Sequence, residues 1–189
     1  MGLRCETERL LLRDWRESDW EPFWRLTNTP AVMRWLGGVL DGRGMAEARG
    51  RLEGYARDHG HTFWVVERKT DGGHLSGEML GFCGLKRANQ PGGPQGDFEV
   101  GWRLREDAWG HGYALEAARA ALDMAFGRFG APHVIALTVP GNEASWGLMR
   151  RLGMQRREDL DFDFDGWDVE TGRVIAYRLD REAWPASRA

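Results

Sequence analysis

Two glycines at the start of a helical pattern have the spacing in this chain that most clearly suggests chemistry. The segment 98–126 reads FEVGWRLREDAWGHGYALEAARAALDMAF, so an alternating strand runs into a turn that contains Gly110 and Gly112. Such a turn exposes the N–H groups that open the next helix, and these groups attract phosphate. The segment therefore predicts a site for an anionic cofactor. Ordinary turn glycines are the alternative interpretation.

The composition limits the classes of protein that need to be considered. A chain of 189 residues is long enough for one core, so we expect a single domain over 1–182 and a C-terminal tail over 183–189. Lys and Arg total 26 against 29 Asp and Glu, which argues against an extended nucleic-acid surface. Cys5 and Cys83 provide no disulfide framework. With no signal-peptide pattern and no apolar run of membrane-spanning length, we expect a cytoplasmic protein without a membrane partner.

The hydrophobic pattern predicts an α/β fold, with one sheet and helices on both of its faces. We expect strands over 9–15, 62–69, 79–88, 98–104, 134–139, 154–164 and 174–179. We expect helices over 17–36 with a break near Pro30, and over 45–59, 112–129 and 142–153. The second and third strands form a hairpin, and 134–139 is a buried strand reached by a crossover helix. Asn142 is the expected N-cap of the last helix and Gly153 its left-handed stop.

Four pieces of the chain carry a resemblance to a known family. They are EVGWRL, WGHGYALEA, NEASWGLMRRLGM and VIAYRL. In order and spacing they resemble the GNAT superfamily of N-acetyltransferases, most closely its RimJ/RimL-like branch, which acetylates protein N-termini. The resemblance implies a mixed, mostly antiparallel sheet of about seven strands in which the fourth and fifth, 98–104 and 134–139, splay apart. It also implies acetyl-CoA as co-substrate, no metal, and a possible homodimer.

The resemblance assigns the cofactor to two stretches of backbone. The pyrophosphate would lie on the loop formed by Trp109, Gly110, His111, Gly112, Tyr113 and Ala114. The pantetheine arm would pair, as an added strand does, with Trp102, Arg103 and Leu104. Asn142 would contact the arm from the other side, unless it serves only as the helix cap. Trp109 departs from the superfamily pattern, which often has Gln or Arg there; tryptophan is common at this position in the proposed branch.

Acyl transfer from a thioester to an amine needs a neutral amine, a stabilised oxyanion and help for the departing thiolate. An α-amino group with a pKa near 8 is easier to deprotonate at neutral pH than a lysine with a pKa near 10.4. Glu99 matches the acidic residue of the family's E-I-G-Y pattern and would accept the proton through water. A solvated strand residue is the alternative for Glu99. The oxyanion is expected at a backbone N–H of Trp102 or Arg103.

Help for the thiolate is expected from the start of the last helix. Many members of the superfamily have a tyrosine at the position of Met149, which cannot donate a proton. Ser145 resembles the serine used in the RimJ/RimL-like branch and would hydrogen-bond the sulfur while the helix N-terminus favours its negative charge. A serine that satisfies only the backbone is the alternative.

The acceptor side is predicted from fewer signals. In the family, the position of Trp35 lies in the wall of the acceptor groove. Packing in the core explains a tryptophan at this position equally well. The segment DLDFDFDGWD alternates, which would place Asp161, Asp163 and Asp165 on one strand face as an acidic ridge. Edge strands also carry charges merely to block aggregation, and that is the interpretation we favour. Four histidines, His59, His61, His74 and His133, lack metal-ligand spacing, so no metal is expected.

Three functions remain open at this stage. The first is acetylation of a protein or peptide N-terminus. The second is acetylation of a small amine such as a polyamine, an amino acid or an aminoglycoside. The third is a non-catalytic module that binds acyl-CoA. A P-loop is disfavoured because GHGYAL lacks the Lys and Ser/Thr pair of that motif.

Overall fold

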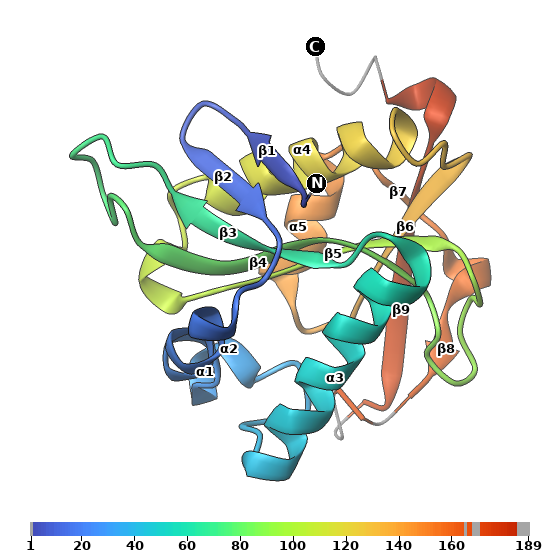
Figure 1. The fold of residues 1–189 in the computed structure, drawn as a ribbon. Helices are drawn as coiled ribbons and strands as arrows, with labels where there is room; N and C mark the ends of the chain where they lie inside the picture. Colours follow the sequence, from blue (N-terminus) through green and yellow to red (C-terminus); the bar gives the residue numbers. More distant parts are fainter. Residues whose placement is uncertain (1, 165, 168–170, 185–189) are drawn as a thin grey trace.

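The computed structural model describes residues 2–164, 166–167 and 171–184, which are built on one mixed, mostly antiparallel sheet (Figure 1). Within these residues the sheet has nine strands in the order β1-β2-β3-β4-β5-β6-β9-β7, and β8 pairs with β9. The strands are β1 (Arg4–Glu6), β2 (Leu10–Arg13), β3 (Phe63–Arg68), β4 (Met79–Arg87), β5 (Phe98–Leu104), β6 (His133–Thr138), β7 (Gln155–Arg156), β8 (Phe162–Asp163) and β9 (Arg173–Asp180).

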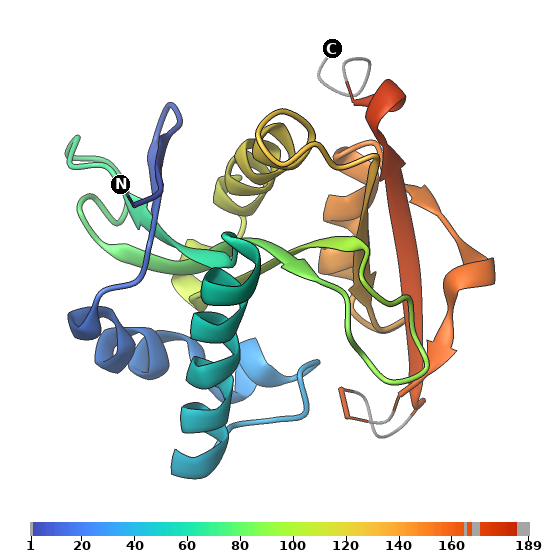
Figure 2. The same cartoon turned by 45° about the vertical axis from the view of Figure 1, so that its right-hand side comes forward.

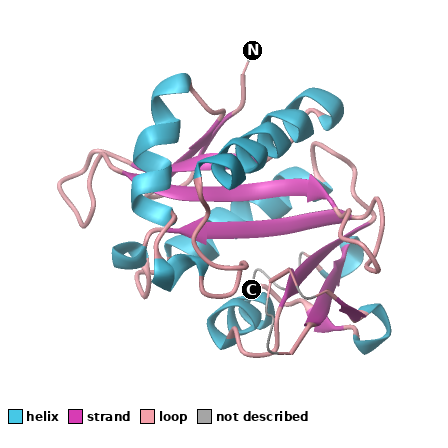
Figure 3. Cartoon of the chain, turned by 90° about the horizontal axis from the view of Figure 1, so that it is seen from below, coloured by secondary structure: helices cyan, strands magenta, loops and turns pink. Residues whose placement is uncertain are grey.

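Helices cover both faces of this sheet, as predicted (Figure 3). They are α1 (Trp20–Thr27), α2 (Pro30–Met33), α3 (Gly42–His59), α4 (Tyr113–Phe126) and α5 (Glu143–Arg151), with 3-10 turns at Glu17–Asp19, Glu106–Ala108, Glu158–Leu160 and Arg181–Ala183. The larger core packs α4 and α5 against one face. On the other face α1 and α3 build a smaller, aromatic core around Trp20, Phe23 and Leu52. The two faces therefore present different chemistry to anything bound at the sheet.

The feature of the sheet that matters for function is the junction of β5 and β6. These strands are parallel and pair only at Phe98 with Val134 and at Glu99 with Ile135. Beyond that point β6 continues alongside β9 up to Thr138, while β5 continues alongside β4. Figure 2 shows the half of the sheet with β6 and β9 turned steeply against the half with β1–β5. The predicted divergence of the fourth and fifth strands is thus confirmed.

Two predictions about strands were wrong. The chain has an additional first strand, β1, which pairs with β2 and was not expected. The expected strand over 154–164 is instead two short strands separated by the turn Glu158–Leu160. Asp161 causes part of this break, because its carboxylate turns inward to Arg156 and accepts the Ala176 N–H at 3.1 Å.

Other local predictions are confirmed. The hairpin joins β3 to β4, the helical segment 17–36 breaks before Pro30, and α5 starts at an Asn142 cap. Within the described ranges no helix is long and apolar enough to cross a bilayer. The domain boundary after residue 182 stays a prediction, as does the homodimer. Trp184 lies beyond that boundary and is buried, with its ring 5.9 Å from that of Phe126.

Candidate active site

The N-terminus of α4 is uncapped, because its first N–H groups donate to no other described residue. We call this an open helix start. Gly112 is the N-cap in the left-handed conformation, with φ 80°, and no side chain caps the helix. The first helical bond runs from the Glu116 N–H to the Gly112 carbonyl at 3.1 Å. The N–H groups of residues 113–115 donate to no other described residue. Because no side chain caps the helix, these free N–H groups and the positive end of the helix dipole are available to an anion.

The loop before α4 has room where a ligand would need it. Gly110 has φ 77°, and a Cβ built on it would meet no atom within 4 Å. A Cβ on Gly112 would lie 3.4 Å from Nη2 of Arg9. Both glycines are therefore required by their left-handed backbone rather than by crowding. The open space and the free donors fit a diphosphate group.

Positive side chains gather around the same loop. Arg9 donates to the His111 carbonyl at 3.0 Å and is itself held by Glu116, with 2.7 Å between Nε and Oε2. The His111 ring stacks on that of His74 at 3.8 Å, and Arg68 Nε lies 3.3 Å from the Tyr113 hydroxyl. His74, to which the sequence assigned no role, thus belongs to the site. It comes from the β3–β4 turn, and no local sequence signal joins it to residue 111.

The hydrogen bonds at the two ends of β5 show which backbone groups face the divergence. The Ala88 N–H donates to the Asp97 carbonyl at 2.9 Å, and the Arg105 N–H donates to the Leu80 carbonyl at 2.8 Å. In an antiparallel pair, alternate residues turn both backbone groups to the same neighbour. Odd-numbered residues from 97 to 105 therefore bond to β4. Even-numbered residues turn toward β6.

The backbone of Trp102 accordingly faces an edge where no strand is paired, because β6 has already diverged at Ile135. One group on this edge is occupied, since the Trp109 indole N–H donates to the Leu104 carbonyl at 3.0 Å. The Trp102 N–H and carbonyl and the Leu104 N–H remain. An extended amide-bearing chain can pair with such an edge as an added strand does. Arg103 is different, because its N–H points to β4.

Glu99 is buried on β5 and faces away from α4. Its side chain lies directly opposite Lys86 of β4, with 3.1 Å between Nζ and Oε2. The Lys86 ammonium directs hydrogen bonds to Asn89 at 3.0 Å and Gln90 at 3.1 Å, and Glu99 Oε2 has no hydrogen-bond partner in the described part of the chain. Burial raises the pKa of Glu99 above its usual 4.5, and Lys86 opposes this effect. The carboxylate is therefore a stronger base than a solvated glutamate.

The N-terminus of α5 is capped by the side chain of Asn142. We call this a closed helix start. The Ser145 N–H donates to Asn142 Oδ1 at 3.3 Å and the Glu143 N–H to the Gly141 carbonyl at 3.0 Å. Asn142 is thus the N-cap, which was one of its two predicted roles. The Ser145 hydroxyl makes no hydrogen bond to another described residue and is half-buried. Met149 is buried one turn further on and provides no donor.

The two predicted acceptor residues have different surroundings. The Trp35 ring packs on Gly141, so closely that a Cβ on Gly141 would lie 2.7 Å from it. Asp163 is exposed on β8 and paired with Arg173 at 3.0 Å. The common strand face expected for Asp161, Asp163 and Asp165 is wrong for Asp161, whose side chain is buried, and Asp165 lies outside the described residues. Trp35 thus borders the start of α5, and Asp163 stays a prediction.

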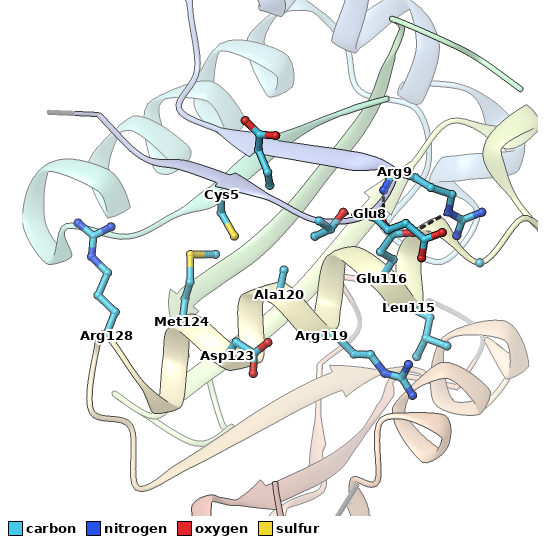
Figure 4. A pocket seen from close by; sticks show the side chains of 13 residues that line it. Cys5, Glu8, Arg9, Leu115, Glu116, Arg119, Ala120, Asp123, Met124 and Arg128 are labelled. Atoms are coloured by element: carbon cyan, nitrogen blue, oxygen red, sulfur yellow. Dashed lines mark hydrogen bonds and ion pairs between the residues drawn. The ribbon is translucent and has the colours of Figure 1, made fainter. Parts of the chain in front are cut away.

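Two further features bear on metal or ligand binding: the grouping of possible metal ligands, and a groove beside α4. In the described ranges no three His, Cys, Asp or Glu side chains are grouped as metal ligands would be. A groove of about 680 Å³ lies between the segment 5–9 and α4, beside Cys5, Leu115, Arg119 and Met124 (Figure 4). Gly112 is the one predicted site residue that lines it. The groove contains neither Glu99 nor Ser145, so the proposed chemistry lies elsewhere.

Comparisons with known proteins agree with this geometry. The model of the acetyltransferase (GNAT) domain matches residues 9–155. The protein YkkB of Bacillus subtilis (strain 168) is 34% identical over 149 residues, which cover 78% of this chain and 83% of YkkB.

Two solved structures share the fold. An acetyltransferase from Agrobacterium tumefaciens has a TM-score of 0.76 at 24% identity and covers 94% of both chains. A ribosomal-protein-S5-alanine acetyltransferase from Vibrio fischeri has a TM-score of 0.71 at 16% identity, covering 96% of this chain and 98% of its own. A family match over most of the chain removes the non-catalytic alternative. The chain belongs to the GNAT family and is an N-acetyltransferase.

Proposed function

We propose that this protein transfers the acetyl group of acetyl-CoA to an α-amino group at the N-terminus of a peptide or protein, as in the RimJ/RimL-like branch. One observation carries the proposal. A buried carboxylate, Glu99, lies on the same strand as the unpaired backbone of Trp102, and this strand leads to the open start of α4. The segment 99–115 thus carries all three parts of the site within 25 residues or fewer. They are a base, a strand edge for an amide-bearing arm, and a cradle for a diphosphate.

The residues of the cradle and the edge hold the donor. The free N–H groups of residues 113–115 and the space at Gly110 receive the diphosphate, and the Trp102 carbonyl and the Leu104 N–H pair with the pantetheine amides. When bound, acetyl-CoA supplies an activated thioester. Of the two predicted oxyanion donors we retain the Trp102 N–H, because the Arg103 N–H is directed to β4.

Glu99 accepts a proton from the acceptor amine through a water molecule. Its raised pKa brings it closer to that of an α-amino group near 8 than an ordinary glutamate would be. An acceptor lysine with a pKa near 10.4 would demand a stronger base. Ser145 donates its unused hydroxyl to the departing sulfur. The Vibrio fischeri protein is named a ribosomal-protein-S5-alanine acetyltransferase, so a protein acceptor has a precedent among the proteins that share this fold.

The experiment that tests this function measures release of free thiol from acetyl-CoA with matched acceptors. One peptide has a free α-amino group and no lysine, and its partner has a blocked N-terminus and one lysine. Spermidine represents the small amines. We expect the free α-amino peptide to be preferred by at least about tenfold in kcat/KM, given the pKa difference. A preference for spermidine or lysine would contradict the proposed acceptor while leaving acetyl transfer intact.

The pH dependence tests the role of Glu99. Both the amine and Glu99 must lose a proton, so activity rises with pH and is lost as pH falls through their pKa values. Below both pKa values the slope of log kcat/KM against pH is about two for the wild type and about one for Glu99→Gln, which also lowers kcat by about 10²-fold or more. Lys86→Met is the control: it removes the charge that lowers the Glu99 pKa, so the acid limb moves to higher pH. An unchanged slope in Glu99→Gln would exclude Glu99 as the base.

A further inference from the structure

Arg103 is a buried cation for which the described part of the chain provides no counter-charge. Arg103 is 9% exposed, and its guanidinium carbon lies over three rings, at 4.6 Å from Phe23, 5.5 Å from Trp24 and 5.1 Å from Phe82. Nη1 lies 3.1 Å from the sulfur of Met33. Nε is buried and has no hydrogen-bond partner among the described residues. No carboxylate of the described chain forms an ion pair with this group.

A second buried arginine shows how the same chain normally satisfies such a group. Arg13 is 7% exposed and donates to both oxygens of Asp19, at 2.7 and 2.9 Å, and to Glu67 at 2.9 Å. Ring faces replace part of the lost hydration of Arg103, but they supply no full negative charge. A buried unpaired cation is costly, so an anion that reached this position would be stabilised there.

The charges around Arg103 strengthen this conclusion. Burial, and to a lesser extent the nearby cation Arg51 of α3, lower the pKa of Arg103 to about 10. Arg103 therefore remains protonated at neutral pH. Arg51 is exposed and is in no ion pair with another described residue. The surroundings thus repel a cation and attract an anion.

The position of Arg103 relates it to the acceptor rather than to the cofactor. Its side chain leaves β5 on the same face as that of Glu99, opposite the face covered by α4. Four residues of strand separate the two, a distance of about 13 Å. Between them lies Gly101, and the Phe63 ring occupies the space where its side chain would be, 2.9 Å from a built Cβ. An amine held near Glu99 and an anion held at Arg103 can belong to one small molecule lying across this aromatic floor.

We propose that Arg103 binds a carboxylate carried by the acceptor, a few bonds from the amine that is acetylated. This inference rests on the proposed function and narrows its acceptor class. A planar guanidinium with free donors suits a carboxylate. The carboxylate has two possible sources: the α-carboxylate of a free amino acid, or the acidic side chain of the first residues of a peptide.

The test compares acidic acceptors with their neutral isosteres. In the first arm, C-terminally amidated peptides begin with Asp or with Asn. In the second, free alanine is compared with alaninamide at neutral pH, where Arg103 is protonated, and kcat/KM is expressed for the unprotonated amine of each. We expect the wild type to favour the carboxylate by at least about 30-fold in kcat/KM in one arm, and Arg103→Met to reduce that ratio to near one. Arg103→Lys, which keeps the charge, should retain part of the preference.

A matched variant controls for net charge and folding. Arg128→Met removes one positive charge at the end of the helix on the opposite face and should keep the wild-type ratio. Methionine at 103 fills the site with an apolar side chain of similar length, so thermal unfolding should show a folded protein. Acetylation of neutral acceptors without any preference for carboxylates overturns the inference but leaves the proposed function standing.

Binding of reaction products gives a readout that does not need turnover. N-acetylaspartyl and N-acetylasparaginyl peptides, N-acetylalanine and N-acetylalaninamide are titrated into the CoA-bound protein by calorimetry. The acidic product of one pair should bind at least about tenfold more tightly than its neutral partner in the wild type and equally in Arg103→Met. Equal or undetectable binding in both pairs overturns the inference, even if no acceptor is turned over.

Discussion

The N-termini of α4 and α5 face the same divergence of strands, yet the chain treats their first N–H groups in opposite ways. At α4 a left-handed glycine stands at the N-cap, and residues 113–115 donate to no described residue. At α5 the Asn142 side chain accepts the Ser145 N–H and the Gly141 carbonyl accepts the Glu143 N–H. An open helix start offers several donors and positive potential to a ligand, whereas a capped one offers fewer donors.

The difference separates two tasks that both involve negative charge. A diphosphate carries permanent charge and needs several direct donors, which the open end supplies. A thiolate acquires its charge only as the thioester breaks, so one hydroxyl, that of Ser145, and the field of a capped helix are enough. The open end thus serves binding, and the closed end serves a transient state.

The largest effect should follow from placing a charge in the open end. Gly110→Asp puts a carboxylate into empty space beside the free donors, where it competes with the diphosphate. Asp and Asn both tolerate a left-handed backbone, so Gly110→Asn is the matched control. Calorimetry should show acetyl-CoA affinity lowered by at least about 30-fold for Asp and only slightly for Asn. Similar losses in both variants would mean that shape, and not charge, explains the effect.

A smaller effect should appear in turnover at the closed end. Ser145→Ala removes the hydroxyl but leaves the Asn142 cap, which uses the backbone of residue 145. We expect kcat to fall about tenfold, with acetyl-CoA affinity changed by less than about twofold. Ser145→Thr keeps a hydroxyl and should recover part of kcat. If Ala turns over as fast as the wild type, Ser145 has no part in the reaction and the closed end is only structural.

The smallest effect concerns stability. Asn142→Ala removes the cap and should lower the free energy of unfolding by about 1 kcal/mol, as urea denaturation would measure. Asn142→Asp keeps an accepting oxygen and should keep that stability. Because neither variant has the amide N–H₂, a loss of acetyl-CoA affinity in both would reveal a contact between Asn142 and the pantetheine arm. Equal affinities would leave the cap as its sole role.

The sequence predicted the parts of the site that depend on local rules. Left-handed glycines before a helix, the Asn142 cap and an alternating strand each depend on neighbours a few residues away. The turn at Gly110 and Gly112 and the Asn142 cap were therefore predictable from spacing, whereas the role expected of Ser145 came from the family resemblance. The divergence of β5 and β6 came from the family resemblance, because no local pattern states where two strands stop pairing.

The remaining features depend on contacts between distant segments. His74 reaches residue 111 from another turn, and Lys86 faces Glu99 only because of the register between two strands. Asp161 fits an alternating strand in sequence but turns inward to Arg156, 5 residues earlier. A partner for a charged side chain cannot be predicted from periodicity, since any exposed or buried charge satisfies the same pattern.

The packing of Trp35 on Gly141 has a consequence for attempts to redesign the acceptor range. Any side chain larger than hydrogen at position 141 would meet the edge of the indole, so the half-buried Trp35 would have to shift. A change at either position alone would therefore alter the packing over the start of α5. Randomising both positions together, with bulk exchanged between them, is the route by which directed evolution would reach new substrates.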